Sequence, residues 1–228
     1  MSDPSTGSGR ALDSTGSGAG VEVGELSDQL VDLPVASSEL VFDGAIWNVR
    51  RDRLAYAAGE ITREYIDHPG AVAVLVLDDQ DRVCLIRQYR HPIRTREWEL
   101  PAGLLDFVGE SALSAAQREL AEEVDLVAGD WALLTDFHTS PGGSNESLRV
   151  YLARDISDAS EVFERTDEES EIEKRWVGLD EVVDAVLDRR VQNSILAIAA
   201  LAAHASRERG WSSLGDAESP WTRHPLAR

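Results

Sequence analysis

The sequence has little of several features that mark other classes of protein. It contains one cysteine, Cys84, so no disulfide can form within the chain, and this thiol lies in an apolar run typical of a buried strand. No apolar stretch approaches the roughly 20 residues of a membrane-spanning helix, and no signal-peptide pattern opens the sequence. Basic residues are scarce, since 22 Lys and Arg stand against 42 Asp and Glu for a net charge of −20. We therefore expect a cytoplasmic protein that binds neither nucleic acid nor an anionic membrane.

Composition divides the 228 residues into a tail, a small sheet, a main domain and a second tail, with boundaries at 1–37, 38–68, 69–210 and 211–228. The first tail is rich in Ser, Gly, Thr and Asp without apolar periodicity, so we expect disorder. Short alternating pieces in the second part predict an antiparallel sheet of two or three strands. We expect Trp211 and Trp221 to pin the last part.

The main domain alternates apolar strands with helices. The run Ala71–Leu77 is apolar throughout, as in a strand buried on both faces. Further strands are predicted over Val83–Tyr89, Trp131–His138, Leu148–Ala153 and Lys174–Val177. Helices are predicted over Leu179–Arg189 and Asn193–Ser206, and the second is apolar nearly all round, so we expect it to be packed inside.

Between these elements, the stretch from Gly103 to Leu126 ends in a helix with three carboxylates on one face. Glu119, Glu122 and Glu123 stand at i, i+3 and i+4, within an arc of about 100°. The stretch also holds a predicted helix cap at Ser111 and an apolar stripe at Leu113, Ala116, Leu120 and Val124. Such carboxylates are either a solvated acidic face or the oxygen ligands of Mg²⁺ or Mn²⁺.

The same stretch resembles the Nudix box of the Nudix hydrolase family, whose pattern runs G-x5-E-x7-R-E-U-x-E-E-x-G-U, with U apolar. Gly103, Glu110 and Arg118 match its structural positions. The sequence departs twice, with one extra residue in the turn Asp106–Gly109 and with Asp125 in place of glycine. Loop length is inexpensive to vary, and aspartate tolerates the left-handed conformation that ends a helix. Neither departure removes a carboxylate.

The resemblance implies a Nudix α/β/α sandwich with a mixed sheet, preceded by the small N-terminal antiparallel sheet. It implies a bound Mg²⁺ or Mn²⁺, and it implies as metal ligands the Ala102 carbonyl and the carboxylates of Glu119, Glu122 and Glu123. It also implies that Arg118 pairs with Glu110 and does not touch substrate.

Two more segments are similar to the ADP-ribose pyrophosphatase branch of that family. The segment QYR…WELPAGLLD leads into the box, and Pro141 lies 141 − 126 = 15 residues beyond Leu126, where a proline marks that branch. The implied reaction is metal-dependent hydrolysis of ADP-ribose to AMP and ribose 5-phosphate. Three alternatives stay open: a pyrophosphatase for another nucleoside diphosphate sugar, a non-catalytic Nudix-fold ligand sensor, and a structural protein with an acidic helix, which the two motifs disfavour.

The candidate substrate-binding residues are Arg90, Arg63, Trp47, Glu146 and Pro141. Arg90 is the first choice, because guanidinium groups bind diphosphate in a bidentate manner. The resemblance implies a homodimer formed through the N-terminal sheet. Trp47 is either an aromatic contact to the adenine bound by the partner subunit or part of the dimer core.

A general base is also required, because metal alone does not deprotonate water. ADP-ribose pyrophosphatases draw this base from a loop before the strand that corresponds to Lys174–Val177. The E-x-x-[DE]-I pattern there begins at Glu168, and Glu169 is the second candidate.

Overall fold

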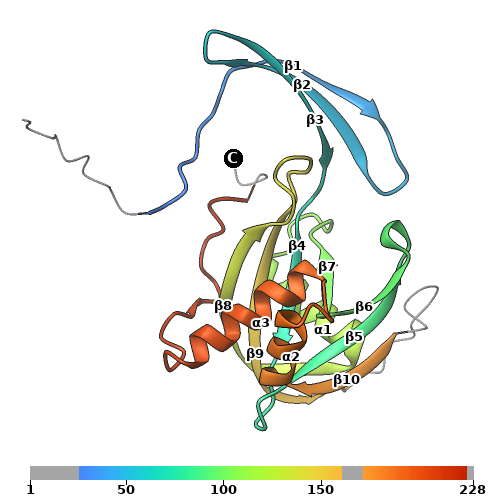
Figure 1. Ribbon diagram of the computed structural model, residues 1–228, viewed down its shortest axis with the longest axis vertical. Helices are drawn as coiled ribbons and strands as arrows, with labels where there is room; N and C mark the ends of the chain where they lie inside the picture. Colours follow the sequence, from blue (N-terminus) through green and yellow to red (C-terminus); the bar gives the residue numbers. More distant parts are fainter. Residues whose placement is uncertain (1–25, 161–171, 225–228) are drawn as a thin grey trace, which may run out of the picture. The chain divides into compact units, whose positions relative to one another are not determined.

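The computed structural model describes residues 26–160 and 172–224 (Figure 1). The chain divides into two units, Met1–Asp32 and Leu33–Arg228, and the elements below belong to the second. Within the described ranges, no helix is both long and apolar enough to cross a membrane.

The N-terminal sheet has the antiparallel order β1-β2-β3, with strands Val35–Phe42, Asn48–Tyr56 and Gly59–Asp67. The predicted small sheet is thus confirmed, although β1 begins at Val35, inside the segment expected to be disordered. Ion pairs link β2 to β3, such as Arg50 with Asp67 at 2.8 Å. Cross-strand pairs of this kind stabilise a sheet modestly and fix its register.

The central sheet has five strands in the order β11-β8-β9-β4-β7. Its strands are β4 (Ala71–Val76), β7 (Ala102–Leu104), β8 (Leu126–His138), β9 (Ser147–Asp158) and β11 (Gly215–Asp216). Strand β4 runs parallel to β9 and antiparallel to β7, so the sheet is mixed.

A second sheet of three strands has the order β10-β5-β6. It consists of β10 (Glu173–Gly178), β5 (Arg82–Arg90) and β6 (Thr95–Glu99), with the 3-10 turn η1 (His91–Ile93) between β5 and β6. The predicted strand at residues 174–177 is confirmed.

In the described part of the chain, three helices pack on the central and second sheets: α1 (Ala112–Val124), α2 (Leu179–Leu187) and α3 (Ser194–Arg207). Alternate β4 residues feed two cores, because side chains of a strand point to opposite faces. Val72, Val74 and Val76 pack in the core that contains α1 residues, while Leu75 and its neighbours pack in the core that contains α2 and α3 residues. Both faces of β4 are therefore buried, and the predicted α/β/α sandwich is confirmed.

One expectation about α3 was wrong. The helix is not packed inside on all sides, because Ile198 and Leu201 are 37% and 40% exposed. Its alanines, Ala199, Ala200 and Ala203, face the core instead. Small side chains let the helix lie close to the sheet, and the outer face has no further layer over it.

Candidate active site

The box helix α1 is fixed at both ends by local contacts. The Ser111 hydroxyl oxygen accepts a hydrogen bond from the Ser114 N–H at 3.0 Å, as an N-cap does. Asp125 adopts the left-handed conformation, with φ 57° and ψ 39°, and its N–H donates to the Ala121 carbonyl. Both predictions about the helix ends are confirmed, and the substitution of Asp125 for glycine leaves the helix end intact.

Arg118 lies among three carboxylates. Its Nε and Nη2 donate to Glu110 at 3.0 and 3.1 Å, which confirms the predicted pair. Its Nη1 donates to Glu119 at 2.7 Å and to Glu122 at 3.0 Å. These hydrogen bonds raise the pKa of the Arg118 guanidinium, and the bond to Glu110 contributes most. The carboxylates thus converge on a cation and outnumber it.

Strand β7 meets this cluster from the other side. The Ala102 N–H donates to the Glu123 carboxylate at 2.9 Å, and Glu123 is only 7% exposed. Gly103 provides the close approach that Glu119 needs, because a Cβ at Gly103 would overlap the Glu119 carboxylate. The box glycine therefore keeps a space for a carboxylate next to Ala102.

These residues fit a hard divalent cation. Carboxylate and carbonyl oxygens are the ligands that Mg²⁺ and Mn²⁺ prefer. No group of three acidic, His or Cys side chains is arranged to hold a metal within residues 26–160 and 172–224. The reason is orientation, since Glu119 and Glu122 turn toward Arg118 and Glu123 turns toward the Ala102 N–H.

Arg90, the first choice for substrate contact, is held by Glu99. Its Nε and Nη2 donate to the two carboxylate oxygens at 2.9 and 2.6 Å. The Glu99 side chain is buried, whereas 47% of the Arg90 side chain is exposed. Sequence reasoning missed Glu99, although its place two residues before Pro101 in WELPAG could have indicated it. Arg90 is therefore oriented by a buried partner and still reaches solvent.

The loop between β8 and β9 is joined to the end of β3. The Asn145 side chain accepts from the His68 N–H at 2.7 Å and donates to Asp67 at 3.0 Å. Glu146 hydrogen-bonds to the Thr139 hydroxyl and lies 3.5 Å from His68 Nε2. Burial lowers the pKa of His68, and Glu146 opposes that shift. No local pattern in the sequence predicted this role of Asn145, which joins segments 77 residues apart.

This loop lines a cavity of about 450 Å³, which we call the Pro141 cavity. Its wall brings together two predicted substrate-binding residues, Arg63 from β3 and Pro141 from the loop. It also contains His138, at the end of β8, and Arg223, for which the sequence predicted no role. The remaining lining residues are Glu64, Tyr65, Gly142, Ser144 and Asn145.

The box and the Pro141 cavity lie at one end of the central sheet. Ala71, the first residue of β4, pairs with Leu104 on one side and Leu148 on the other. Because β7 runs antiparallel to β4, the box loop leaves the sheet there, and the Pro141 loop enters β9 at the same end. Leu105 also donates to the Gly70 carbonyl at 3.0 Å. The two predicted motifs, 15 residues apart in sequence, thus share one edge of the fold.

The remaining predicted residues are Trp47 and the two candidate bases. Trp47 stacks on His68 of the same chain, with ring centroids 4.5 Å apart and planes inclined by 19°. Both candidate bases, Glu168 and Glu169, lie outside the described residues.

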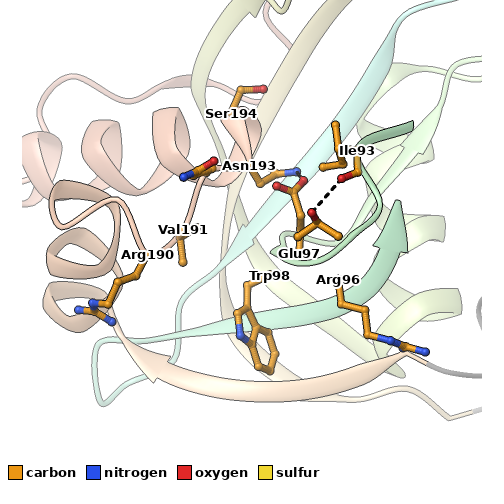
Figure 2. Close-up of a pocket in the computed structure, with 10 residues that line it drawn as sticks. Ile93, Arg96, Glu97, Trp98, Arg190, Val191, Asn193 and Ser194 are labelled. Atoms are coloured by element: carbon orange, nitrogen blue, oxygen red, sulfur yellow. Dashed lines mark hydrogen bonds between the residues drawn. The ribbon is translucent and has the colours of Figure 1, made fainter. Parts of the chain in front are cut away.

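A further cavity of about 650 Å³ lies between β6 and the connection from α2 to α3 (Figure 2). Glu97 in its wall accepts from the Asn193 side chain at 3.3 Å, while Arg96 and Arg190 extend away from Glu97 in the view. No box residue lines this cavity, and neither does a residue of the Pro141 loop. We do not assign the site to it.

Comparison with known proteins adds three findings. Residues 67–198 match the family model of the NUDIX domain. An ADP-ribose pyrophosphatase of Mycobacterium tuberculosis is 40% identical over 197 residues, which are 86% of this chain and 94% of the relative. An ADP-ribose pyrophosphatase of Bacillus subtilis is 34% identical over 164 residues, 72% of this chain and 88% of the relative.

Among solved structures, the crystal structure of an ADP compounds hydrolase superposes with a TM-score of 0.66. The match covers 81% of this chain and 99% of that one at 22% identity, so it bears on the fold alone.

Proposed function

Because this chain belongs to the Nudix hydrolase family, we propose that it hydrolyses ADP-ribose to AMP and ribose 5-phosphate with Mg²⁺ or Mn²⁺. One observation carries the proposal: the box carboxylates gather beside Ala102 and Gly103, at the same sheet end as the Pro141 cavity. The names of the two ADP-ribose pyrophosphatases, which cover most of this chain, support the choice of substrate.

The metal would be held by Glu119, Glu122, Glu123 and the Ala102 carbonyl. When bound, it would neutralise the diphosphate and lower the pKa of a coordinated water. Arg118 keeps the carboxylates close together before the metal arrives, and its bond with Glu110 anchors it to the box loop. Gly103 leaves room for the Glu119 carboxylate beside Ala102.

The substrate would be held by arginines on two sides. Arg90 presents a guanidinium that Glu99 orients, which reduces the entropy lost on binding a phosphate. Arg63 and Pro141 line the Pro141 cavity, and Glu146 lies beside it in the same loop. We assign Trp47, stacked on His68, to an aromatic contact with the adenine or to the dimer core.

Water activation requires a base in addition. We keep Glu168 as the proposed general base and Glu169 as the second candidate, on the sequence pattern alone. Replacing each by glutamine separates them, because only loss of the base should abolish turnover and leave substrate affinity intact.

We also propose a homodimer through the N-terminal sheet and a cytoplasmic location. All three strands expose large apolar side chains, among them Phe42, Tyr56 and Ile66. Apolar groups gathered on one small sheet are typical of an interface. Light scattering coupled to size exclusion should give twice the 24.9 kDa chain mass, and a monomer would contradict the proposal.

The decisive experiment incubates the protein with ADP-ribose, other nucleoside diphosphate sugars, dinucleotides and nucleoside triphosphates, with Mg²⁺, Mn²⁺ or EDTA. We expect AMP and ribose 5-phosphate from ADP-ribose, at a rate that EDTA abolishes. Faster turnover of another diphosphate sugar would reassign the substrate. Tight binding of ADP-ribose without any turnover would favour the ligand sensor.

A further inference from the structure

The C-terminal segment 219–224 follows β11 and lies against the start of β9. Arg149, in β9, is the group that holds it. The Arg149 side chain is 3% exposed and donates to both carboxylate oxygens of Asp136 at 2.8 Å. Its Nη1 donates to the Ser219 carbonyl at 2.7 Å, and its guanidinium lies 4.8 Å from the centre of the Trp221 ring. A buried arginine thus binds this segment through one carbonyl and one aromatic face.

A second anchor lies at His224. This side chain is 8% exposed and packs against Gly70, where a Cβ would overlap the imidazole. Gly70 has φ +92° and stands at the junction of β3 and β4, one residue before Ala71. Trp221 and His224 also contact each other, with ring centroids 4.6 Å apart. The segment is therefore fixed on both sides of Arg223.

Arg223 itself lines the Pro141 cavity together with Arg63. The two arginines come from distant parts of the chain, one from β3 and one from the C-terminal segment. In a protein with a net charge of −20, an anionic nucleotide meets a repulsive field unless cations surround its binding site. Arg63 and Arg223 in one cavity wall provide such cations, and the Glu64 carboxylate of the same wall is paired with Arg51 at 2.6 Å.

We infer that Arg223 is a substrate-contacting residue, which the C-terminal segment delivers to the Pro141 cavity, where it binds the anionic part of the nucleotide. This inference rests on the proposed function, since it takes the cavity to hold the substrate. Arg149, Trp221 and His224 are its positioning residues. Arg223 adds affinity and does not act as an acid or a base, because its guanidinium cannot exchange a proton at neutral pH.

The test replaces Arg223 by glutamine and measures kcat and KM for ADP-ribose with Mg²⁺. The matched control is Arg209→Gln, which removes the same charge from an exposed residue that does not line the cavity. We expect Arg223→Gln to raise KM about tenfold or more with kcat nearly unchanged, while the control keeps both values. Arg223→Lys should recover part of the affinity, since it keeps the charge and loses the fork geometry.

A binding titration with ADP-ribose in EDTA separates this inference from the proposed function. If the wild-type protein binds ADP-ribose but releases no AMP, the proposed reaction is wrong and the Kd of Arg223→Gln still decides the role of Arg223. Equal Kd values for wild type and Arg223→Gln would overturn the inference, and so would an equal loss in the Arg209 control.

Substitutions of Trp221 test whether the C-terminal segment positions Arg223. Trp221→Ala should weaken ADP-ribose binding, and the double variant with Arg223→Gln should bind no more weakly than Arg223→Gln alone. Trp221→Phe keeps an aromatic face for Arg149 and should bind as the wild type does. Additive losses in the double variant would show that Trp221 does not act through Arg223.

Discussion

Two arginines, Arg118 and Arg149, organise two regions at the same end of the sheet in different ways. Arg118 donates to three carboxylates and lies partly exposed in the box. Arg149 is buried and donates to a single carboxylate, that of Asp136, and to a backbone carbonyl. The charge around Arg149 is balanced, whereas carboxylate charge exceeds guanidinium charge around Arg118.

This difference separates a binding region from a structural one. Excess negative charge repels itself, and in a small space it favours a further cation, which is what a metal site requires. A region with balanced charge and satisfied hydrogen bonds does not require a further cation. Removing one partner of such an ion pair leaves the other partner buried and unpaired. Changes in the box should therefore affect activity more than stability, and changes around Arg149 should do the reverse.

The largest effect is expected in the box, from Glu119→Gln. Loss of one proposed metal ligand should lower kcat/KM for ADP-ribose about a thousandfold, because metal stabilisation of the developing charge amounts to several kcal/mol. The Tm in EDTA should stay level or rise, because one like-charge repulsion is removed. Steady-state kinetics and thermal unfolding measure the two quantities.

The control for this variant is Glu60→Gln, which removes the same charge from an exposed ion pair on β3. Its kinetics should match the wild type. Equal rates for Glu119→Gln and the wild type would remove Glu119 from the metal site.

The next effect concerns stability, from Arg149→Met. The variant leaves Asp136 and the Ser219 carbonyl without their donor, at a cost of about 2–3 kcal/mol, since Asp136 keeps some contact with water. The Tm should fall by about 4–12 °C in a domain of this size. Arg118→Met in EDTA should lower the Tm by less, because the Arg118 side chain is 24% exposed, against 3% for Arg149, so that less buried contact is lost. Equal falls in Tm would contradict the contrast between the two regions.

A smaller effect is expected from Gly103→Ala. The new methyl group would overlap the Glu119 carboxylate, which must then turn away from Ala102. Displacing a metal ligand in this way should lower kcat/KM about 10- to 100-fold, with little change in Tm because the side chain can move. Gly59→Ala is the matched control, since an added Cβ there meets no atom within 4 Å. Wild-type kinetics in Gly103→Ala would contradict the role of the glycine.

The same contrast explains how far the sequence could be interpreted. The cap of the box helix was predictable because its contact is local, since Ser111 caps the helix three residues away. The pairing of Arg118 with Glu110, which lies outside the helix, followed from the family resemblance. The burial of β4 was predictable because the strand is apolar throughout, and the sandwich followed from the family resemblance.

The region around Arg149 was not predictable in this way. Arg149 and Ser219 are 70 residues apart, and no periodic pattern relates them. The prediction that α3 is buried on all sides failed for a related reason. The number of apolar residues in a helix does not show whether another element packs on its outer face, where Ile198 and Leu201 are exposed.

The smallest effect is a pH dependence at His224, beside Arg149. Burial lowers the pKa of His224 below 6.5, and the charge of Arg149 lowers it further. A hydrogen bond to the Pro69 backbone and the charge of Asp136 raise the pKa, but they do not reverse the shift. The unfolded chain therefore binds more protons, so stability rises with pH in this window and is lost as pH falls below about 6.5. His68 shifts in the same direction. In EDTA, the Tm of the wild type should fall between pH 7.5 and 5.5, and His224→Gln should fall by about 2–4 °C less. Parallel curves of Tm against pH for the two proteins would show that the imidazole of His224 is not buried in its neutral form beside Gly70. The C-terminal segment would then be anchored by Arg149 alone.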